Sequence, residues 1–424
     1  MMYERWREVA AARQDELALY DAGSGRRWTF GQLALQTEVV PLSSQALAFP
    51  KGTTAEFVFT VLQAWRAGHV VVPLEAEQTP LVFTALPHGI VHVKTTSATT
   101  GAPRALLFTA SQLIADAANI VQTMGLRADW PNLGVISLAH SYGFSNLVLP
   151  LLLHGIPLVL LESPLPEAVR RCASLFQDIT LPAVPILWRA WHEAGAIPKN
   201  VRLAISAGAS LPLALEHEIF QTSGLKLHNF YGASECGGIA YDSTAVPRTD
   251  AACVGTPLQN VALSISEDHC LEVRSAAVAE TYWSQPEANL AGGCYRTSDL
   301  AEIIGGQIFL RGRATDQINV AGRKVSPDGI ERVLLEHPLV SGCLVFGAPS
   351  PDDGRPEIIV AAVVAHAPVS GEALKQFLLA RLPAWQVPRE WWFVDSLTAN
   401  TRGKLSRAEW RRRCRAERSG GVMK

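Results

Sequence analysis

Hydroxyl side chains and a glycine are concentrated in residues 96–104, which read T-S-A-T-T-G-A-P-R. Apolar, strand-like runs flank this segment at residues 90–93 and 105–108. Hydroxyl groups and backbone amides in a tight turn can bind an anion, and Arg104 adds a fixed positive charge. The G-x-x-x-x-G-K-[ST] spacing of a Walker phosphate loop is absent. Taken alone, the segment also fits a plain loop rich in serine, threonine and glycine.

Five later segments contain residue types that bind nucleotides or metal ions. They are residues 206–212 (S-A-G-A-S-L-P), 229–235 (N-F-Y-G-A-S-E), 295–299 (Y-R-T-S-D), 311–325 (R-G-R-A-T-D-Q-I-N-V-A-G-R-K-V) and 398–407 (T-A-N-T-R-G-K-L-S-R). Without its neighbours, Tyr231 would be read as a half-buried strand residue and Lys404 as a solvated surface charge.

In this order the segments resemble the acyl-adenylating superfamily. That family contains acyl- and aryl-CoA synthetases, adenylation domains of peptide synthetases and firefly-type luciferases, and the fatty-acyl and aryl-CoA ligase branch is the most similar. Its patterns are [ST]-S-G-[ST]-T-G-x-P-K, Y-G-x-[ST]-E, Y-x-T-G-D, G-R-x-[DK]-x-x-I-x-x-x-G and P-x-T-x-x-G-K. The resemblance covers nearly the whole chain. The departures from these patterns are Ala98, Arg104, Ser298 and Thr315.

The resemblance implies a role for each matching residue. The nucleotide would be bound by Thr96, Ser97, Thr99, Thr100, Gly101, Arg104, Gly208, Ala209, Ser210, Tyr231, Gly232, Ser234, Asp299, Arg313 and Gly322. Catalytic roles would fall to Lys404, Glu235 and His140. Tyr231 would stack on adenine, Asp299 would accept hydrogen bonds from the ribose hydroxyls, and Glu235 would be the metal ligand. Lys404 would bridge the acid and the α-phosphate.

The reaction implied is the activation of a small carboxylic acid with ATP and Mg²⁺ as an acyl-AMP, followed by transfer to the thiol of CoA. Residues 140–144 read H-S-Y-G-F and resemble the H-x-x-G stretch of fatty-acyl and aryl-CoA ligases. They differ from the aspartate-containing stretch with which peptide-synthetase domains hold an amino group. We therefore expect an aromatic or medium-chain aliphatic acid without an α-amine, in a pocket lined by Gly237, Gly238 and Ile239. His140 could line the carboxylate path or simply pack at a strand end.

Two other functions stay open at this point. The acyl group could be loaded onto the phosphopantetheine arm of an acyl carrier protein, and turnover with free CoA would discriminate between the two acceptors. The chain could also be a non-catalytic nucleotide-binding protein, which the four departures would suggest. Glu235, Asp299, Arg313 and Lys404 argue against that second alternative because all four match the family patterns.

The elements that must position these residues follow an α/β pattern. Strand-like runs at residues 69–74, 134–138, 158–161 and 203–206 alternate with helical segments such as 55–67 and 111–123. This alternation predicts a mainly parallel sheet that is covered on both faces. Thr29 and Gln32 fit a capping box at the start of a further helix. Residues 254–310 change to brief alternating strands, which predicts a small antiparallel sheet or barrel-like subdomain.

We expect a large N-terminal adenylate-forming domain at residues 1–312 and a small, mobile α+β lid domain at residues 313–424. The lid domain would contain a helix at residues 329–336, a strand at 357–364 and Lys404. In the family it rotates about a hinge, for which Thr315 or the adjacent Asp316 is the candidate. The front of the large domain is compact, since only about twenty residues separate Leu74 from Thr96.

Composition narrows the class of protein. The 424 residues are 48% hydrophobic and 18% charged, as in a well-packed globular protein of two or three units. A formal charge of -2 argues against nucleic acid or an anionic membrane as the main partner. Seven scattered cysteines without a C-x-x-C pair suit a reducing cytoplasm. The longest apolar run, residues 147–161, contains two prolines and a histidine and predicts no membrane span. A homodimer is left open.

Overall fold

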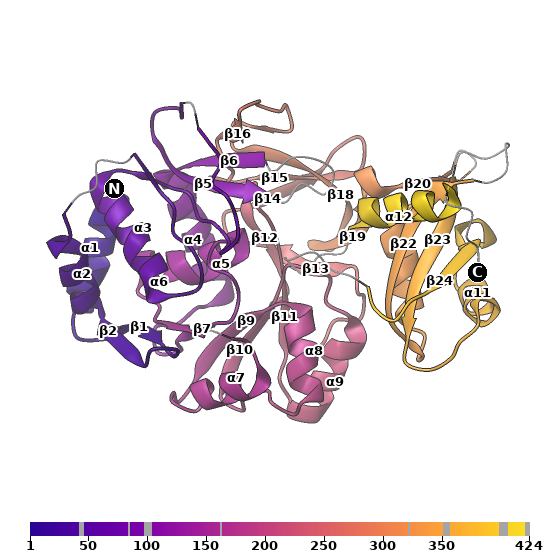
Figure 1. Ribbon diagram of the computed structural model, residues 1–424, viewed down its shortest axis with the longest axis horizontal. Coiled ribbons are helices and arrows are strands. Elements are labelled where there is room, and N and C mark those ends of the chain that lie inside the picture. Colours follow the sequence, from indigo (N-terminus) through magenta and orange to yellow (C-terminus); the bar gives the residue numbers. More distant parts are fainter. Residues whose placement is uncertain are drawn as a thin grey trace.

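The computed structural model describes residues 1–41, 46–83, 85–96, 104–161, 163–320, 323–350, 357–397 and 406–419. Figure 1 shows a large lobe that carries the N-terminus and a smaller lobe, coloured orange to yellow, that contains the end of the chain. The predicted mixed α/β fold is confirmed.

A parallel sheet forms the centre of the large lobe. Its strands are β1 (Leu17–Asp21), β8 (Leu158–Leu160), β7 (Asn132–Gly134), β9 (Ile179–Ala183), β10 (Val201–Ser206) and β11 (Leu227–Ala233), in that spatial order. The helices of this lobe are α1 (Met2–Ala12), α2 (Phe30–Val39), α3 (Ala55–Ala67), α4 (Ala110–Met124), α5 (Ser141–Gly143), α6 (Leu149–His154), α7 (Pro166–Ala173), α8 (Pro185–Glu193) and α9 (Leu213–Ser223). Their apolar faces bury the sheet, with Trp188 and Trp191 of α8 fully enclosed.

Antiparallel strands continue the same hydrogen-bonded sheet. They are β12 (Gly237–Tyr241), β13 (Cys253–Pro257), β19 (Gln307–Arg313), β18 (Cys294–Ile304), β15 (Cys270–Arg274) and β14 (Ala262–Ile265), with β17 (Leu290–Ala291) beside β18 and β2 (Arg26–Thr29) beside β1. The antiparallel strands predicted for residues 254–310 are therefore present, and β12 and β13 join them to the parallel sheet.

A second sheet carries the strands around the predicted phosphate segment. Within the described residues its order is β16 (Thr281–Trp283), β6 (Arg104–Thr109), β5 (Ile90–Thr96), β4 (Val70–Val71) and β3 (Leu47–Ala48). Helix α3 has the predicted bounds, and the capping box predicted at Thr29 and Gln32 starts helix α2. The strand predicted at residues 134–138 instead ends at Gly134, because Ile136 and Leu138 are buried by side-chain packing without strand pairing.

The small lobe is a three-stranded sheet with helices on both faces. Its strands are β22 (Val340–Pro349), β23 (Glu357–Ala365) and β24 (Glu390–Phe393), beside a hairpin of β20 (Ile318–Val320) and β21 (Arg323–Val325). Alternate residues of β22 and β23 enter two cores, one with α10 (Pro327–Leu334) and α11 (Gly371–Leu379) and one with α12 (Arg407–Ser419). The predicted domain boundary falls at the end of β19 and stays a prediction.

None of the described helices combines the length and the apolar character needed to cross a membrane.

His154, the last residue of α6, is expected to make stability depend on pH. Burial, helped by the positive charge of Arg5, lowers its pKa from 6.5 to about 4, and Nε2 is buried without a hydrogen-bond partner among the described residues. Between these two pKa values the unfolded chain binds a proton that the folded chain does not bind, so stability falls as the pH is lowered from 6.5 towards 4. Urea unfolding measured at about pH 7.5 and at about pH 5 tests this.

The His154→Gln variant should lose part of this pH dependence, whereas His88→Gln, at an exposed loop position, should keep all of it. An unchanged pH dependence in His154→Gln would show that another group is responsible.

Candidate active site

The segments predicted to contact adenine leave the parallel sheet at one edge. Strands β10 and β11 run parallel with Ser206 beside Asn229, so both continue past the same end of the sheet. Gly208, Ala209 and Ser210 lie exposed in the loop after β10, and Tyr231 lies near the end of β11. Ligands in open α/β sheets bind outside the carboxyl ends of the strands. The structure therefore places the two segments where a shared ligand can reach both.

Near the end of β11, Asp299 contacts both Tyr231 and Arg313. The Tyr231 hydroxyl donates to Asp299 Oδ2 at 2.6 Å, and Arg313 Nε donates to Asp299 Oδ1 at 2.9 Å. Asp299 on β18 pairs directly with Arg313 on β19, so the register of the two strands fixes this contact. Burial and the Asp299 carboxylate raise the pKa of Tyr231, which keeps its hydroxyl a donor. The side chain predicted to stack on adenine and the carboxylate predicted to bind ribose are thus in contact.

Glu235 lies in the turn after β11 and is 9% exposed. Its Oε1 accepts a hydrogen bond of 3.0 Å from the hydroxyl of Tyr282, whose pKa is raised by burial and by the Glu235 charge. Arg104, at the start of β6, places its guanidinium carbon 4.3 Å from the centre of the Tyr282 ring and forms an ion pair with Glu287. Tyr282 therefore connects the predicted metal ligand to the predicted phosphate-binding arginine.

The donor set around Glu235 fits magnesium held jointly with a nucleotide. Among the described residues there is no group of three or more His, Cys, Asp or Glu side chains that could hold a metal ion by itself. Mg²⁺ in nucleotide sites is commonly held by one or two carboxylates together with substrate phosphates and water. A single carboxylate that Tyr282 connects to Arg104 agrees with that arrangement.

His140 lies just before helix α5, on the side where the acid is expected. Its Nε2 lies 3.4 Å from Glu75 Oε1, and the same oxygen accepts a hydrogen bond of 2.9 Å from the Ser137 hydroxyl. The next turns place Tyr142 against Phe230, with ring centres 6.0 Å apart. His140 therefore has a carboxylate partner and is partly open to solvent, which a histidine packed at a strand end would not require.

Gly237 and Gly238, which were predicted to line the acid pocket, are closely packed on the side to which a Cβ would point. A Cβ atom added at Gly237 would overlap the Asp116 carboxylate, and one added at Gly238 would overlap Leu258. Gly237, Gly238 and Ile239 are all buried. The glycines thus allow close packing behind the strand, and their place in an acid pocket stays a prediction.

Several predicted site residues lie outside the described residues. They are Ser97, Thr99, Thr100, Gly101, Gly322 and Lys404, together with the departure Ala98. Their roles stay predictions. Thr96 ends β5, and Gly232 and Ser234 lie between Tyr231 and Glu235.

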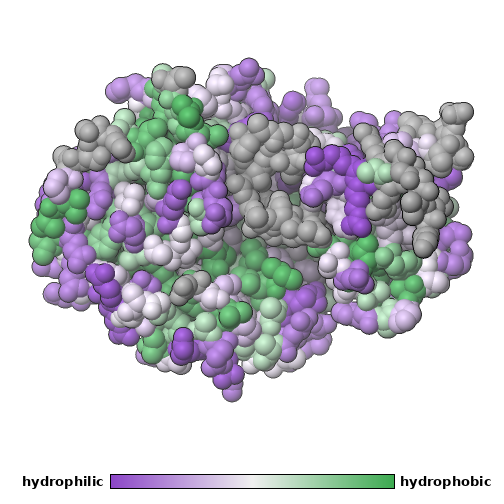
Figure 2. All heavy atoms as spheres, viewed as in Figure 1, coloured by the Kyte–Doolittle hydropathy of each residue, from purple (hydrophilic) through white to green (hydrophobic). Residues whose placement is uncertain are grey.

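Arg407 anchors the chain just after Lys404 to the predicted hinge. Its Nη1 donates to Asp316 Oδ2 at 2.8 Å, and its Nη2 donates to Asp328 Oδ1 at 2.8 Å and Glu331 Oε2 at 2.7 Å. Asp316 ends the turn η2 (Ala314–Asp316) that follows β19. Thr315 of the same turn is exposed. Of the two hinge candidates, Asp316 is therefore the one that contacts the rest of the small lobe. Figure 2 shows strongly hydrophilic side chains on the small lobe beside the large one.

Sequence reasoning missed Tyr282, Glu287 and Glu75. Tyr282 reaches Glu235 because β16 pairs with β6, with Tyr282 opposite Leu106, and no sequence pattern encodes that long-range pairing. Glu75 follows Leu74 in a short loop whose sequence carries no motif. A charged residue directly after a buried run was the only available signal for it.

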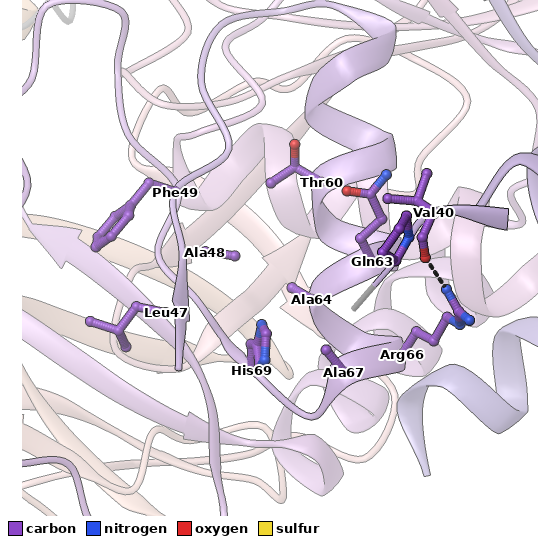
Figure 3. Close-up of a pocket in the computed structure, with 11 residues that line it drawn as sticks. Val40, Leu47, Ala48, Phe49, Thr60, Gln63, Ala64, Arg66, Ala67 and His69 are labelled. Carbon is purple, nitrogen blue, oxygen red and sulfur yellow. Dashed lines mark hydrogen bonds between the residues drawn. The ribbon is translucent and has the colours of Figure 1, made fainter. Parts of the chain in front are cut away.

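A separate cavity of about 220 Å³ lies between α3 and β3 (Figure 3). The Arg66 guanidinium there donates to the backbone carbonyls of Val40 and Thr37 at 2.7 and 3.0 Å. The cavity lining contains none of the predicted site residues. It therefore adds nothing to the site at the sheet edge.

The chain resembles known proteins in both sequence and structure. The family described as AMP-binding enzyme matches residues 83–288, and its C-terminal domain matches residues 329–404. A probable 2-succinylbenzoate–CoA ligase from Mycobacterium tuberculosis is 28% identical over 397 residues, which cover 88% of this chain and 99% of the relative. Anthranilate–CoA ligase from Pseudomonas aeruginosa is 27% identical over 338 residues, which cover 74% of this chain and 65% of the relative. The structure of o-succinylbenzoate CoA synthetase from Bacillus subtilis, in complex with its acyl-adenylate, superposes with a TM-score of 0.83 at 20% identity and covers 96% of this chain and 97% of that one.

Proposed function

The chain belongs to the AMP-binding enzyme family, and on that premise we propose that it is an AMP-forming acid–thiol ligase. It would activate a carboxylic acid with ATP as an acyl-AMP and then pass the acyl group to the thiol of CoA. The substrates named for its relatives, 2-succinylbenzoate and anthranilate, are acids that are joined to CoA.

The observation that carries the proposal is the contact of Tyr231 and Arg313 with the two oxygens of Asp299. One carboxylate with both oxygens oriented suits the two hydroxyls of a ribose, since each oxygen can accept a hydrogen bond. Tyr231 offers an aromatic face next to that position, as an adenine ring requires. The loop of Gly208 lies at the same sheet edge and would complete the nucleoside site.

The main task of the protein in this reaction is to hold two anions, the carboxylate and ATP, close together. A carboxylate oxygen attacks the α-phosphate in line while pyrophosphate leaves, so charge neutralisation and orientation set the rate. Arg104, the hydroxyls of Ser97, Thr99 and Thr100, and Lys404 would bind the phosphates and the acid. Mg²⁺, when bound at Glu235, would neutralise phosphate charge. Tyr282 would orient the Glu235 carboxylate through its hydrogen bond to Oε1.

The acid is proposed to be aromatic or medium-chain aliphatic, entering beside His140 and Tyr142. His140 and Glu75 supply polar groups at one side of this path, and Phe230 and Tyr142 supply aromatic surface at the other. The acids named for the relatives, 2-succinylbenzoate and anthranilate, contain a flat ring and support an aromatic acid over a straight chain. The small lobe would rotate about Asp316 for the thiol step, with the Gly322 segment turned towards the thiol.

Acid-dependent exchange of pyrophosphate into ATP tests the first half-reaction. We expect exchange with one or more aromatic acids and weaker exchange with straight-chain acids and amino acids. Addition of free CoA should then release AMP and form the thioester. If only a phosphopantetheinylated carrier protein supports this step, the acceptor is the carrier protein and not CoA. Absence of exchange with every acid, in protein that binds ATP, would contradict the proposal and favour a non-catalytic nucleotide-binding protein.

A further inference from the structure

A buried polar cluster lies behind the proposed site. Asp116 on α4, Lys94 on β5 and Ser145 are 2%, 5% and 2% exposed. Ser145 belongs to a turn of π-helix, η1 (Phe144–Val148), directly after α5. The Ser145 hydroxyl donates to Asp116 Oδ2 at 2.6 Å and lies 3.3 Å from the Lys94 ammonium. Burial of three polar side chains costs free energy that hydrogen bonds must offset, so such a cluster needs a reason.

Asp116 also holds the glycine turn that follows Glu235. Its Oδ1 accepts a hydrogen bond of 3.1 Å from the backbone amide of Gly238. Gly237 has a positive φ of 70° and packs so closely on Asp116 that a Cβ would overlap the carboxylate. The turn and the carboxylate therefore fit each other at a distance that only glycine permits.

The contacts of Asp116 lead to three separate segments of the site. Gly238 follows Glu235 by three residues, and Lys94 precedes Thr96 and the phosphate segment by two. Ser145 follows His140 by five residues, on the turn whose next residue, Asn146, donates to the Tyr142 carbonyl at 3.1 Å. One buried carboxylate thus touches the elements expected to hold the acid, the metal and the phosphates.

The distances show that Asp116 does more than neutralise Lys94 in a buried ion pair. Lys94 Nζ lies 3.7 Å from Asp116 Oδ2, which is longer than either hydrogen bond that Asp116 accepts from Ser145 and Gly238. The ammonium also lies 4.5 Å from the centre of the Phe108 ring. The pKa of Lys94 is lowered, because the effect of burial exceeds the opposing effects of Asp116, Cys236 and Glu235. The shortest contacts of Asp116 are therefore those to the site segments.

We propose that Asp116 is a positioning residue for acid activation, which holds the helix turn after His140 and the turn after Glu235 in fixed register. This inference rests on the proposed ligase function. Because Asp116 makes no described contact with Tyr231, Asp299 or Arg313, its loss should disturb the acid and leave nucleoside binding intact. A misplacement of reacting groups by about 1 Å can cost on the order of a hundredfold in rate.

The test compares the full-length Asp116→Asn and Ser145→Ala variants with wild type in the exchange assay. Asn keeps the shape of Asp116 but removes one acceptor oxygen and the charge. We expect the KM for the acid to rise and kcat to fall, each by on the order of tenfold, with a smaller rise in the KM for ATP that acts through the turn after Glu235 and not through the nucleoside. Ser145→Ala should show the same pattern with a smaller effect, and it serves if Asp116→Asn does not fold.

Asp242→Asn is the matched control. Asp242 forms a buried pair with Lys226 at 2.7 Å just after the other end of β12, and its described side-chain partners, Lys226 and Thr244, lie outside the three segments that Asp116 contacts. The Asp242→Asn substitution should lower the free energy of unfolding without changing the ratio of the KM for the acid to the KM for ATP. Folded Asp116→Asn and Ser145→Ala with wild-type constants, or with changes equal to those of Asp242→Asn, would overturn the inference. A wild-type protein that exchanges with no acid would overturn the proposed function, and this inference with it.

Discussion

Replacing Lys404 with alanine is expected to lower acyl-AMP formation by on the order of 100- to 1000-fold, the usual effect of removing one preorganised charge donor from a transition state. Lys404 lies outside the described residues, and its role follows from the P-x-T-x-x-G-K resemblance of residues 398–404 and from the C-terminal-domain match that ends at residue 404. The ammonium would neutralise the negative charge that builds up between the acid and the α-phosphate. None of the lysines that the structure describes belongs to the constellation at the sheet edge.

The same variant should retain thioester formation from supplied acyl-AMP and CoA, because the role proposed for the lysine belongs to the first half-reaction alone. Each half-reaction is measured separately, the first by pyrophosphate exchange and the second by AMP release from acyl-AMP. Lys375→Ala is the control: Lys375 lies on α11 of the same lobe and pairs with Glu372 at 3.1 Å on the surface. Equal loss of both half-reactions in Lys404→Ala would contradict the assignment.

Sequence motifs predict contacts between neighbouring elements of the site better than contacts between distant segments. Asp299 and Arg313 were predicted from short motifs, and they meet because β18 and β19 are neighbouring strands joined by a turn at Gly305 and Gly306. The segments after β10 and β11 also meet for a general reason, since parallel strands end at one edge. Periodicity and turn residues carry this kind of information.

The contacts that were missed depend on packing between distant segments. Tyr282 reaches Glu235 because β16 pairs with β6. Glu75 contacts His140 although the two residues lie far apart in the sequence. Asp116 occupies a position on α4 that reads as an ordinary helix residue, and only the fold shows that it faces Gly237 and Ser145. The fold also shows that Asp116 and Leu258 pack where side chains at Gly237 and Gly238 would lie, which the sequence does not indicate.

The ribose assignment is tested by Asp299→Ala, which we expect to raise the KM for ATP by on the order of 30- to 150-fold. The estimate takes the lost charge-assisted hydrogen bonds as worth about 2 to 3 kcal/mol, with 1.4 kcal/mol for each factor of ten. Arg313 loses its partner as well, and the Tyr231 hydroxyl loses its acceptor, so the adenine face is less well held.

The matched control for this prediction is Glu302→Gln, on the same strand pair. Glu302 accepts a hydrogen bond of 2.7 Å from Arg311, but this pair lies on the surface, three residues along β18 from Asp299. Exposed pairs of this kind contribute little to stability, so both the KM for ATP and the melting temperature should stay near wild type. If Asp299→Ala leaves the ATP dependence unchanged while it remains folded, the carboxylate does not bind the ribose. The contact of Tyr231, Asp299 and Arg313 would then be a structural link between β11 and the β18–β19 hairpin, and the nucleoside would have to be placed elsewhere along the sheet edge.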